Sequence, residues 1–297
     1  MSTQIESKPD SKFGSDSLLR SPSLEFYREI RSAIMHVAKD PGIGERDLTR
    51  RLFLHLPRFS MEELNDSTLI RSEAERLAAQ IERKRRDYRF LENRPKIQSL
   101  IRGDFELREC SPRIARVIHK SFHYLASYHE GVVHLGLFEK DDTEFPMALA
   151  SLSPMDIRRL YTTFPTSEVR KKILVLSRVF AFDWAPRNTI SYLLSNVDGW
   201  LRRNIPEIKS LLTFLNPNLG FSGASLRASN WNTFLELEPV SSYIRGNYVP
   251  YRLMLGLPDN LRQRVSSSLQ AQRPLKVLRY DLVRRENLIE RSEFIGT

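Results

Sequence analysis

His123 and Tyr124 are adjacent side chains in this sequence that could do chemistry together. An imidazole with an unperturbed pKa titrates near neutrality, so His123 is a candidate general base. The hydroxyl of Tyr124 could donate a hydrogen bond to a developing oxyanion or to a leaving thiolate. The alternative for both is a structural role, because a lone histidine beside aromatic residues is more often a packing residue.

A second candidate is a polar turn between a strand-like run, 173–182, and an apolar-periodic segment, 189–201, that has helical spacing. Another strand-like run follows at 210–215, so we expect a parallel strand pair joined by a right-handed crossover. The turn before such a helix presents backbone N–H groups to an anion. We therefore predict a site for a phosphate-bearing ligand at Pro186, Arg187, Asn188 and Thr189.

After the second of these strands comes a polar, loop-rich run. Loops on a rigid scaffold often carry function, so this run is a candidate wall of a substrate site, with a solvated loop as the alternative. Trp231 at its end could stack on a base flipped out of a duplex, or it could be buried in the core. The candidate substrate-binding residues are Asn216, Ser222, Ser225, Arg227, Ser229, Asn230 and Trp231.

The chain of 297 residues carries a formal net charge of +10, which suggests an acidic partner. Nucleic acid is the first candidate for this partner. Part of the excess is clustered, since five of the seven residues in 83–89 are basic. We predict that these five contact a nucleic-acid backbone: Arg83, Lys84, Arg85, Arg86 and Arg89. The alternative is a basic surface with no partner.

Cysteine and histidine usage argues against a metal site. The only cysteine is Cys110, and the sequence has no HExxH motif. Four histidines are close in sequence, but a helix, a loop and a strand are expected to scatter them: His119, His123, His129 and His134. No apolar run approaches the roughly 20 residues that span a bilayer, and the N-terminus lacks an apolar secretory segment. We expect a cytoplasmic protein with no membrane partner.

Periodicity divides the chain into three parts: a disordered tail over 1–20, a helical arm over 21–100, and a catalytic region over 101–297 with a basic C-terminal extension. In the arm, Ser23 is the expected cap of a first helix, and helices follow at 45–56 and 72–90. They could form a helix-turn-helix DNA reader or a helical bundle packed on the catalytic region.

The catalytic region alternates strands and helices, which predicts an α/β (α+β) fold whose sheet begins antiparallel and contains one parallel pair. The expected strands are 104–110, 132–139, 145–151, 173–182, 210–215, 234–240, 243–251 and 275–283.

Four short patches within 121–231 carry a resemblance to a known family: residues 122–124 (FHY), 176–178 (LSR), 185–188 (APRN), and 220–223 (GFSG) leading into 227–231 (RASNW). In order and spacing they resemble the Mom family of phage-type DNA adenine-modifying proteins, within the GNAT superfamily of N-acyltransferases. The resemblance implies a GNAT-like mixed sheet with flanking helices, and acetyl-CoA or another acyl-CoA as donor. It implies catalytic roles for His123, Tyr124 and Ser177, and a cofactor-binding role for Arg178. The alternative for Arg178 is a simple ion pair with an acidic neighbour.

The sequence departs from the family pattern at three positions. Asn216, Phe221 and Leu226 stand where the family has Asp, His and Tyr. An asparagine cannot serve as a carboxylate base, and a leucine has no phenol. Three functions therefore stay open: modification of an exocyclic amine of a nucleic-acid base, in particular adenine in DNA; acylation of another amine, on a protein, a tRNA or a small molecule; and DNA binding or assembly without catalysis.

Overall fold

The computed structural model describes residues 24–38, 44–88, 97–100, 103–140 and 145–282. The tail predicted over 1–20, the predicted cap Ser23 and the predicted backbone contact Arg89 lie outside these residues, as does 283–297 of the basic extension. In the part of the chain that is described, no helix is long and apolar enough to cross a membrane.

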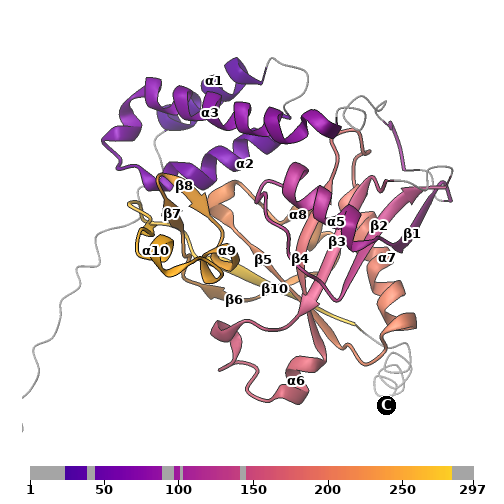
Figure 1. Ribbon diagram of the computed structural model, residues 1–297. Helices are drawn as coiled ribbons and strands as arrows, with labels where there is room; N and C mark the ends of the chain where they lie inside the picture. The colour runs from indigo at the N-terminus through magenta and orange to yellow at the C-terminus, as the bar shows by residue number, and fades with distance from the viewer. Residues whose placement is uncertain (1–23, 39–43, 89–96, 101–102, 141–144, 283–297) are drawn as a thin grey trace, which may run out of the picture.

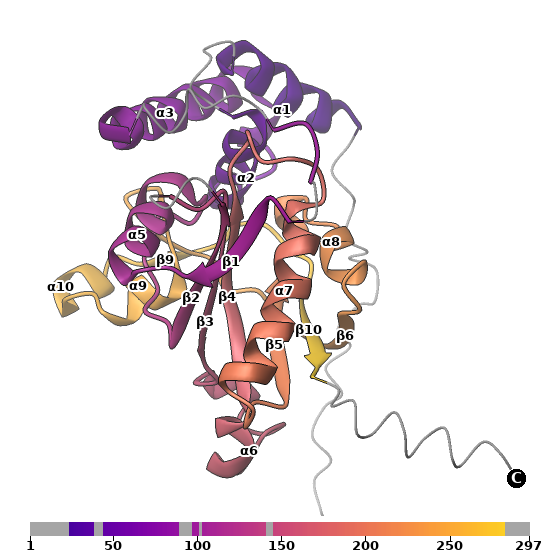
Figure 2. The same ribbon diagram turned by 90° about the vertical axis from the view of Figure 1, so that its right-hand side faces the viewer.

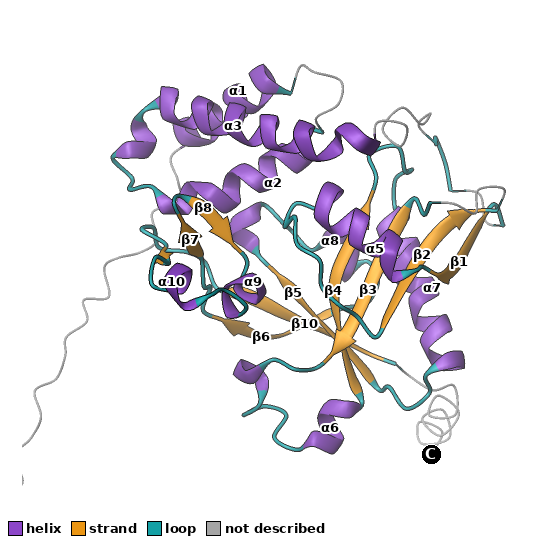
Figure 3. Ribbon diagram, in the orientation of Figure 1, coloured by secondary structure: helices purple, strands orange, loops and turns teal. Residues whose placement is uncertain are grey.

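Three helices form the N-terminal arm: α1 (Leu24–Val37), α2 (Glu45–His55) and α3 (Ser67–Arg85) (Figure 1). Helix α3 starts five residues before the predicted position because the side chain of Asp66 accepts a hydrogen bond from the backbone N–H of Thr68. The apolar faces of the three helices enclose a core of their own. Figure 3 shows them gathered at one end of the molecule, as a helical bundle.

Short helical turns extend the arm: η1 (Leu56–Arg58), η2 (Glu63–Asn65) and η3 (Arg86–Tyr88).

Among the described residues, seven strands form one mixed sheet in the order β1-β2-β3-β4-β5-β10-β6. All neighbours are antiparallel except β4 and β5, which are parallel as predicted. The strands are β1 (Phe105–Glu109), β2 (Val133–Glu139), β3 (Ala148–Pro154), β4 (Ile173–Ala181), β5 (Ser210–Leu215), β6 (Asn232–Leu237) and β10 (Leu275–Asp281). The predicted fold class, a mixed sheet with flanking helices and an N-terminal helical arm, is confirmed.

The parallel pair separates along its length. Strands β4 and β5 share ladder positions only from Ile173 and Ser210 to Val175 and Leu212. Helix α7 (Thr189–Asn204) connects them and covers one face of the sheet, while α5 (Pro112–Val117) lies on the other side (Figure 2). The carboxyl end of β4 is thus free to face other parts of the chain.

The remaining helical segments connect the strands. They are η4, a π-helix (Ile118–Phe122), η5 (Arg158–Leu160), α6 (Ser167–Lys171), η6 (Pro217–Leu219), α8 (Ala224–Arg227), α9 (Tyr251–Leu255) and α10 (Asp259–Arg262).

Where one strand was predicted over 243–251, the chain forms a hairpin. Strand β7 (Ser242–Ile244) turns at Arg245 and Gly246, both at positive φ, into β8 (Asn247–Val249). The strand β9 (Ser266–Ser267) completes this second, three-stranded sheet. A run of β-favouring residues does not reveal a turn of this kind when its glycine is preceded by arginine rather than by Asn or Asp.

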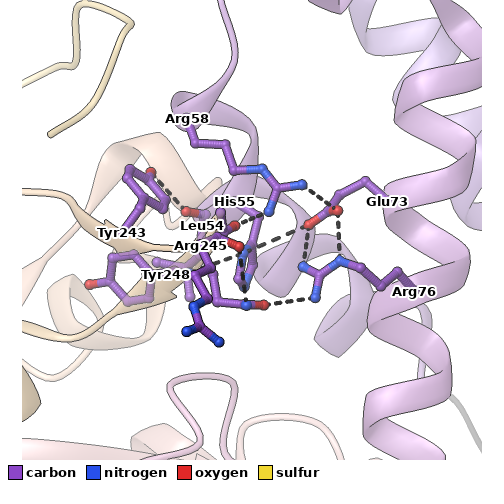
Figure 4. A network of polar contacts seen from close by, with 10 residues as sticks. Leu54, His55, Arg58, Glu73, Arg76, Tyr243, Arg245 and Tyr248 are labelled. Atoms are coloured by element: carbon purple, nitrogen blue, oxygen red, sulfur yellow. Dashed lines mark hydrogen bonds and ion pairs between the residues drawn. The ribbon is translucent and has the colours of Figure 1, made fainter. Parts of the chain in front are cut away.

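The hairpin is fixed to the arm through a polar network (Figure 4). Glu73 of α3 is 3% exposed and accepts bonds from Arg58 (Nη2–Oε2, 2.7 Å) and from Arg76 (Nη2–Oε1, 2.6 Å). Beside it, Nδ1 of His55 accepts a hydrogen bond from the backbone N–H of Tyr248, 3.2 Å away. Arg58 also donates to the Gly246 carbonyl and Arg76 to Oδ1 of Asn247 at 2.8 Å, so the network joins the arm to the hairpin.

Candidate active site

The segment that carries His123 begins with a well-defined helix start. Ser111 caps α5 by accepting from the N–H of Ile114, and Pro112 occupies the first turn. The helix then widens into the π-helix η4, closed by the bond from the His123 N–H to the Ile118 carbonyl (2.9 Å). Such π-turns concentrate at functional sites, because they re-aim side chains.

His123 is 3% exposed and packs on Tyr124, with ring centroids 4.4 Å apart. Its Nδ1 accepts a hydrogen bond from the N–H of Leu125 at 3.2 Å, so the neutral ring carries its proton on Nε2. Burial, with Arg178 as the next largest cause, holds the pKa of His123 well below its usual value. The ring is therefore a hydrogen-bond donor at neutral pH, and this geometry does not favour the general-base role that we predicted.

The chain turns sharply after this pair. Ala126 has φ of 48°, a left-handed conformation that is strained for an alanine. The Ala126 N–H bonds to the His123 carbonyl at 2.8 Å, which closes the turn. This turn brings Ser127 over the sheet.

A bulge in β4 determines where Arg178 points. Ser151 pairs with Arg178 and Leu152 with Leu176, so Ser177 has no partner on β3. Instead the Ser177 hydroxyl donates to the Ser151 carbonyl at 3.0 Å, which makes it a bulge-stabilising residue. Catalysis by Ser177 stays a prediction from the family resemblance.

Arg178 is 9% exposed and donates from Nη2 to the Ser127 hydroxyl (3.2 Å) and from Nη1 to the Ser177 carbonyl (2.7 Å). The alternative of an acidic partner is wrong for the described residues, because none of their ion pairs involves Arg178. Burial lowers the pKa of Arg178, and the hydroxyl groups of Tyr124 and Tyr248 act to raise it. A buried guanidinium without a carboxylate is unusual, because burying a charge is costly unless it is paired.

Tyr124 connects this cation to the arm. The ring centroid of Tyr124 lies 5.5 Å from that of Phe221. The guanidinium of Arg50, on α2 of the arm, lies over the Phe221 ring at 4.7 Å from its centroid. Desolvation raises the pKa of Tyr124, while the charges of Arg178 and Arg50 act to lower it. The hydroxyl is therefore a neutral donor next to two cations, which suits the predicted role of stabilising negative charge.

The prediction that the histidines scatter is wrong for most of them. The His119 ring centroid lies 5.8 Å from that of His134 and 6.2 Å from that of His123. The Ser151 hydroxyl joins His134 Nδ1 (2.8 Å) to His119 Nε2 (3.1 Å), and the Tyr128 hydroxyl reaches His134 Nε2 at 3.3 Å. The sequence analysis missed this buried chain, because only the strand register aligns its members.

The polar row on the sheet continues into the Arg178 site. His134 pairs with Ser151, and Ser151 with Arg178, so the three lie side by side across β2, β3 and β4. No group of three or more His, Cys, Asp or Glu side chains in the described ranges is placed to hold a metal ion. The row is therefore a hydrogen-bonded support under the site.

The predicted ligand turn lies at the start of α7. The Thr189 hydroxyl donates to the Pro186 carbonyl at 2.7 Å, and Asn188 adopts a left-handed φ of 66°. Arg187 and Asn188 are exposed, and no side chain caps the helix. This 16-residue helix thus presents its first backbone N–H groups without a side-chain acceptor, which is compatible with anion binding.

The residues of the polar run 216–231 differ in their surroundings. The Asn216 side chain accepts from the Asn218 N–H at 3.0 Å and so caps η6. Trp231 is 3% exposed and packs on Tyr280, with centroids 5.6 Å apart, so it is a core residue. The other predicted substrate residues, which lie in and around α8 with exposed or half-buried side chains, are Ser222, Ser225, Arg227, Ser229 and Asn230. Phe221 is the member of this run that contacts Tyr124.

The predicted backbone-binding cluster divides in two. Arg83, Lys84 and Arg86 are exposed at the carboxyl end of α3. Arg85 is 8% exposed, pairs with Asp47 (Nη2–Oδ2, 2.9 Å) and donates to the Phe122 carbonyl, so it faces inward. A phosphate on the outer face could contact the first three but not Arg85.

A comparison of the sequence with models of protein families identifies the family to which the chain belongs. Residues 104–269, more than half of the chain, match the model of the Mom protein family. The chain belongs to the Mom family. The match covers every strand of the large sheet except β10, together with the His123–Tyr124 segment, the α7 turn and the hairpin, and it leaves the N-terminal arm outside. No curated protein matches this Mom-family chain.

Several solved structures are similar to this Mom-family chain at low identity. An N-acetyltransferase from Staphylococcus aureus Mu50 is 12% identical over 61% of this chain and 99% of its own, with a TM-score of 0.36. An aminoglycoside N(6')acetyltransferase from Legionella pneumophila is 8% identical over 65% and 98%, with a TM-score of 0.34. Arabidopsis thaliana NAA60 in complex with acetyl-CoA is 8% identical over 60% and 98%, with a TM-score of 0.38.

Proposed function

We propose that the chain transfers an acyl-derived group from an acyl-CoA to the exocyclic amine of a nucleic-acid base. The first candidate for this acceptor base is adenine in DNA. Membership of the Mom family is the observation that carries the reaction class. The arrangement of Tyr124 beside Arg178 and Arg50 supports it, because neutral and cationic donors converge where a transferred group could develop negative charge.

The donor is proposed to lie at the start of α7. The uncapped helix end, the left-handed Asn188 and the exposed Arg187 fit the phosphates of an acyl-CoA. Such a donor supplies a thioester carbonyl that is open to attack by an amine. In the overall exchange a C–N bond forms, the C–S bond breaks, and the amine proton ends on the released thiol.

The protein groups have distinct proposed roles. Tyr124 donates its hydroxyl hydrogen to the oxygen on which charge develops, and His123 holds Tyr124 in place through ring packing while offering Nε2–H as a second donor. The exposed arginines and lysine at the end of α3 contact the nucleic-acid backbone. Arg85 takes no part in that contact, because it is paired with Asp47.

A specific observation keeps a non-catalytic function in view. Asn216 is used as the cap of η6, and Leu226 is half-buried in α8, so neither supplies the acid or base that the family pattern has there. If no substrate is turned over, DNA binding or assembly would be the function. Acylation of another amine, on a protein, a tRNA or a small molecule, is the third candidate, because the donor site does not determine the acceptor.

The test is mass spectrometry of nucleosides from DNA and tRNA of cells that express the protein. Tyr124→Phe removes only the hydroxyl, and Tyr251→Phe is its control, since Tyr251 is 49% exposed. We expect a new modified nucleoside with the wild type and the control, and its loss with Tyr124→Phe. An unchanged nucleoside profile in wild-type cells would contradict base modification, and stabilisation by acyl-CoA or by DNA would then separate the two alternatives.

A further inference from the structure

A shallow apolar groove lies beside α6, at the end of the molecule opposite the helical arm (Figure 2). Its lining includes the buried side chains of Ile173, Leu174 and Ile208, together with Ile205 and Val132. The volume of the groove is about 260 Å³. Sites that enclose a small-molecule ligand usually have roughly 300–1,000 Å³ and several converging polar groups. The groove therefore suits a few apolar side chains better than a cofactor.

The groove lies at the join of the parallel strand pair. Strands β4 and β5 share ladder positions only from Ile173 and Ser210 to Val175 and Leu212, and Ile173 lines the groove. Ile205 and Ile208 belong to the connection through which α7 returns the chain to β5. Side chains that fill the groove therefore also cover the short paired part of β4 and β5.

The described chain ends beside this groove. Strand β10 runs antiparallel to β5 and pairs Asp281 with Ser210. One residue further on, the N–H of Leu282 donates to the carbonyl of Lys209 at 2.9 Å. The two residues before Lys209 line the groove, so the chain that follows Leu282 starts next to it.

The sequence of 283–297, which lies outside the described residues, carries apolar residues within reach of the groove. Leu288 and Ile289 form an adjacent apolar pair, five residues beyond Leu282. Five residues span at most roughly 18 Å. The nearest lining residue, Ile208, is the chain neighbour of Lys209, to which Leu282 is bonded. The link is therefore long enough to bring this pair to the groove and short enough to keep it there.

The charges at the groove match those of the segment. Glu207 at its edge is exposed, and none of the ion pairs between described residues involves it. Because Asp281 stands opposite Ser210, a continued antiparallel register sets Arg284 opposite Glu207. Arg170 and Lys171 also edge the groove, and glutamates flank the apolar pair of the segment. The segment has as many glutamates as arginines, which favours docking on the chain over contact with a phosphate backbone.

We propose that residues 283–297 fold back on the chain, with Leu288 and Ile289 in the groove and Arg284 beside Glu207. The proposal does not depend on acyl transfer. Apolar burial favours the docked arrangement, and the short link raises the effective concentration of the pair at the groove to the order of millimolar. The segment then acts as a strap over the join of β4, β5 and α7. Val132, which is 54% exposed in the described structure, becomes covered by it.

The test is a double-mutant cycle in the full chain, measured by urea denaturation. Val132→Ser changes the groove, and Leu288→Ser combined with Ile289→Ser changes the segment. Val240→Ser is the matched control, because Val240 is 48% exposed and does not line the groove. All of these positions are at the surface of the described structure or outside it, so the variants are expected to fold.

We expect Val132→Ser and the segment variant each to lower the folding equilibrium constant by about fivefold or more. Combined, they should lower it by little more than the larger single effect, because both remove the same contact. Val240→Ser should have an effect of less than about twofold, and it should add to that of the segment variant.

Fully additive effects of Val132→Ser and the segment variant would overturn the proposal, as would a Val132→Ser effect no larger than that of Val240→Ser. Sedimentation of the wild type separates docking within one chain from docking between two. A dimer whose unfolding midpoint rises with protein concentration, and which the segment variant converts to a monomer, would also overturn the proposal. In that case the segment would fill the groove of a second copy.

Discussion

Arg51 of the arm donates a hydrogen bond from Nη2 to the backbone carbonyl of His123, with 3.2 Å between the two atoms. The same nitrogen reaches the Phe122 carbonyl at 3.3 Å, as does Nη2 of Arg85. Asp47 pairs with both arginines, at 3.1 Å and 2.9 Å. A buried ionic cluster of the arm thus holds the end of the π-helix from which the His123–Tyr124 pair projects.

Replacing Arg51 with methionine should loosen this pair. The change removes two hydrogen bonds to carbonyls and one partner of Asp47, while Arg85 keeps the aspartate paired. We expect a loss of about 3 kcal/mol in the free energy of unfolding, measured by urea denaturation. Under conditions where the variant is folded, kcat should fall several-fold with little change in the KM for the donor, because Arg51 does not contact the α7 turn.

Arg71→Met is the control for this experiment. Arg71 pairs with Glu75 one turn along α3, and both side chains are about half exposed, at 52% and 53%. Exposed pairs of this kind contribute under about 0.5 kcal/mol. If Arg51→Met costs no more than Arg71→Met, or leaves kcat unchanged, the arm does not position the His123–Tyr124 pair.

Buried histidines should make the fold sensitive to acid. Burial lowers the pKa of His55 from 6.5 to about 4 and that of His119 to about 3. The unfolded chain therefore takes up protons at these residues below about pH 6.5, while the folded chain does not. Stability is full above that pH and decreases as the pH falls towards the folded pKa values, by up to about 1.4 kcal/mol per pH unit for each histidine.

Urea denaturation at pH 7.5 and pH 5 measures this dependence. His55→Asn keeps an acceptor for the Tyr248 N–H and removes one titrating group, so the difference between the two pH values should shrink. Equal unfolding midpoints of the wild type at both pH values would show that these rings are not held neutral by the fold.

The order of the sheet could be predicted from the sequence because it depends on local patterns. The helical spacing of 189–201 between two apolar runs predicted the parallel β4–β5 pair, and the observed register confirms it. The hairpin at Arg245 was missed, because neither of its turn residues is Asn or Asp and one strand-like run covers both arms.

The site was only partly predictable. The FHY patch identified His123 and Tyr124, but whether His123 has a free lone pair depends on one bond to the Leu125 N–H. Arg85 looked like its neighbours in a basic run, yet the helical period turns it inward to Asp47. The contacts around Tyr124 join residues far apart in the sequence, such as Arg50 and Phe221, and no local pattern reports them.

Ser151 should be the most sensitive small residue of the sheet. Its hydroxyl is the shared partner of His134 and His119, so Ser151→Ala leaves two buried ring nitrogens without that bond. We expect a loss of about 1–3 kcal/mol in the free energy of unfolding. Ser153→Ala is the matched control on the same strand, since Ser153 is equally buried but its hydroxyl makes one long contact of 3.5 Å to the Val175 carbonyl.

The two serine variants remove the same atom from neighbouring positions on one face of β3. Equal losses in urea denaturation would mean that the histidine chain adds nothing beyond ordinary packing. A larger loss at Ser151 than at Ser153 would establish the chain as part of what holds Arg178 in its row.

The exposed end of α3 should determine how DNA binding depends on salt. Each phosphate contact that is lost reduces the slope of log affinity against log salt by about 0.9. Arg83→Gln combined with Arg86→Gln should therefore flatten the slope by up to about 1.8, measured by fluorescence anisotropy with a short duplex. Arg85→Gln should leave the slope unchanged and lower stability instead, because Arg85 is paired with Asp47.

Lys171→Gln combined with Lys172→Gln is the control for the α3 pair. Both lysines are exposed, and α6 lies at the opposite end of the molecule from α3 (Figure 1). The control removes the same net charge, so it separates a local contact from the effect of overall charge. Equal flattening by the two double variants would contradict a binding surface on the arm, whereas an effect confined to α3 would place the backbone of the nucleic acid beside Arg83 and Arg86.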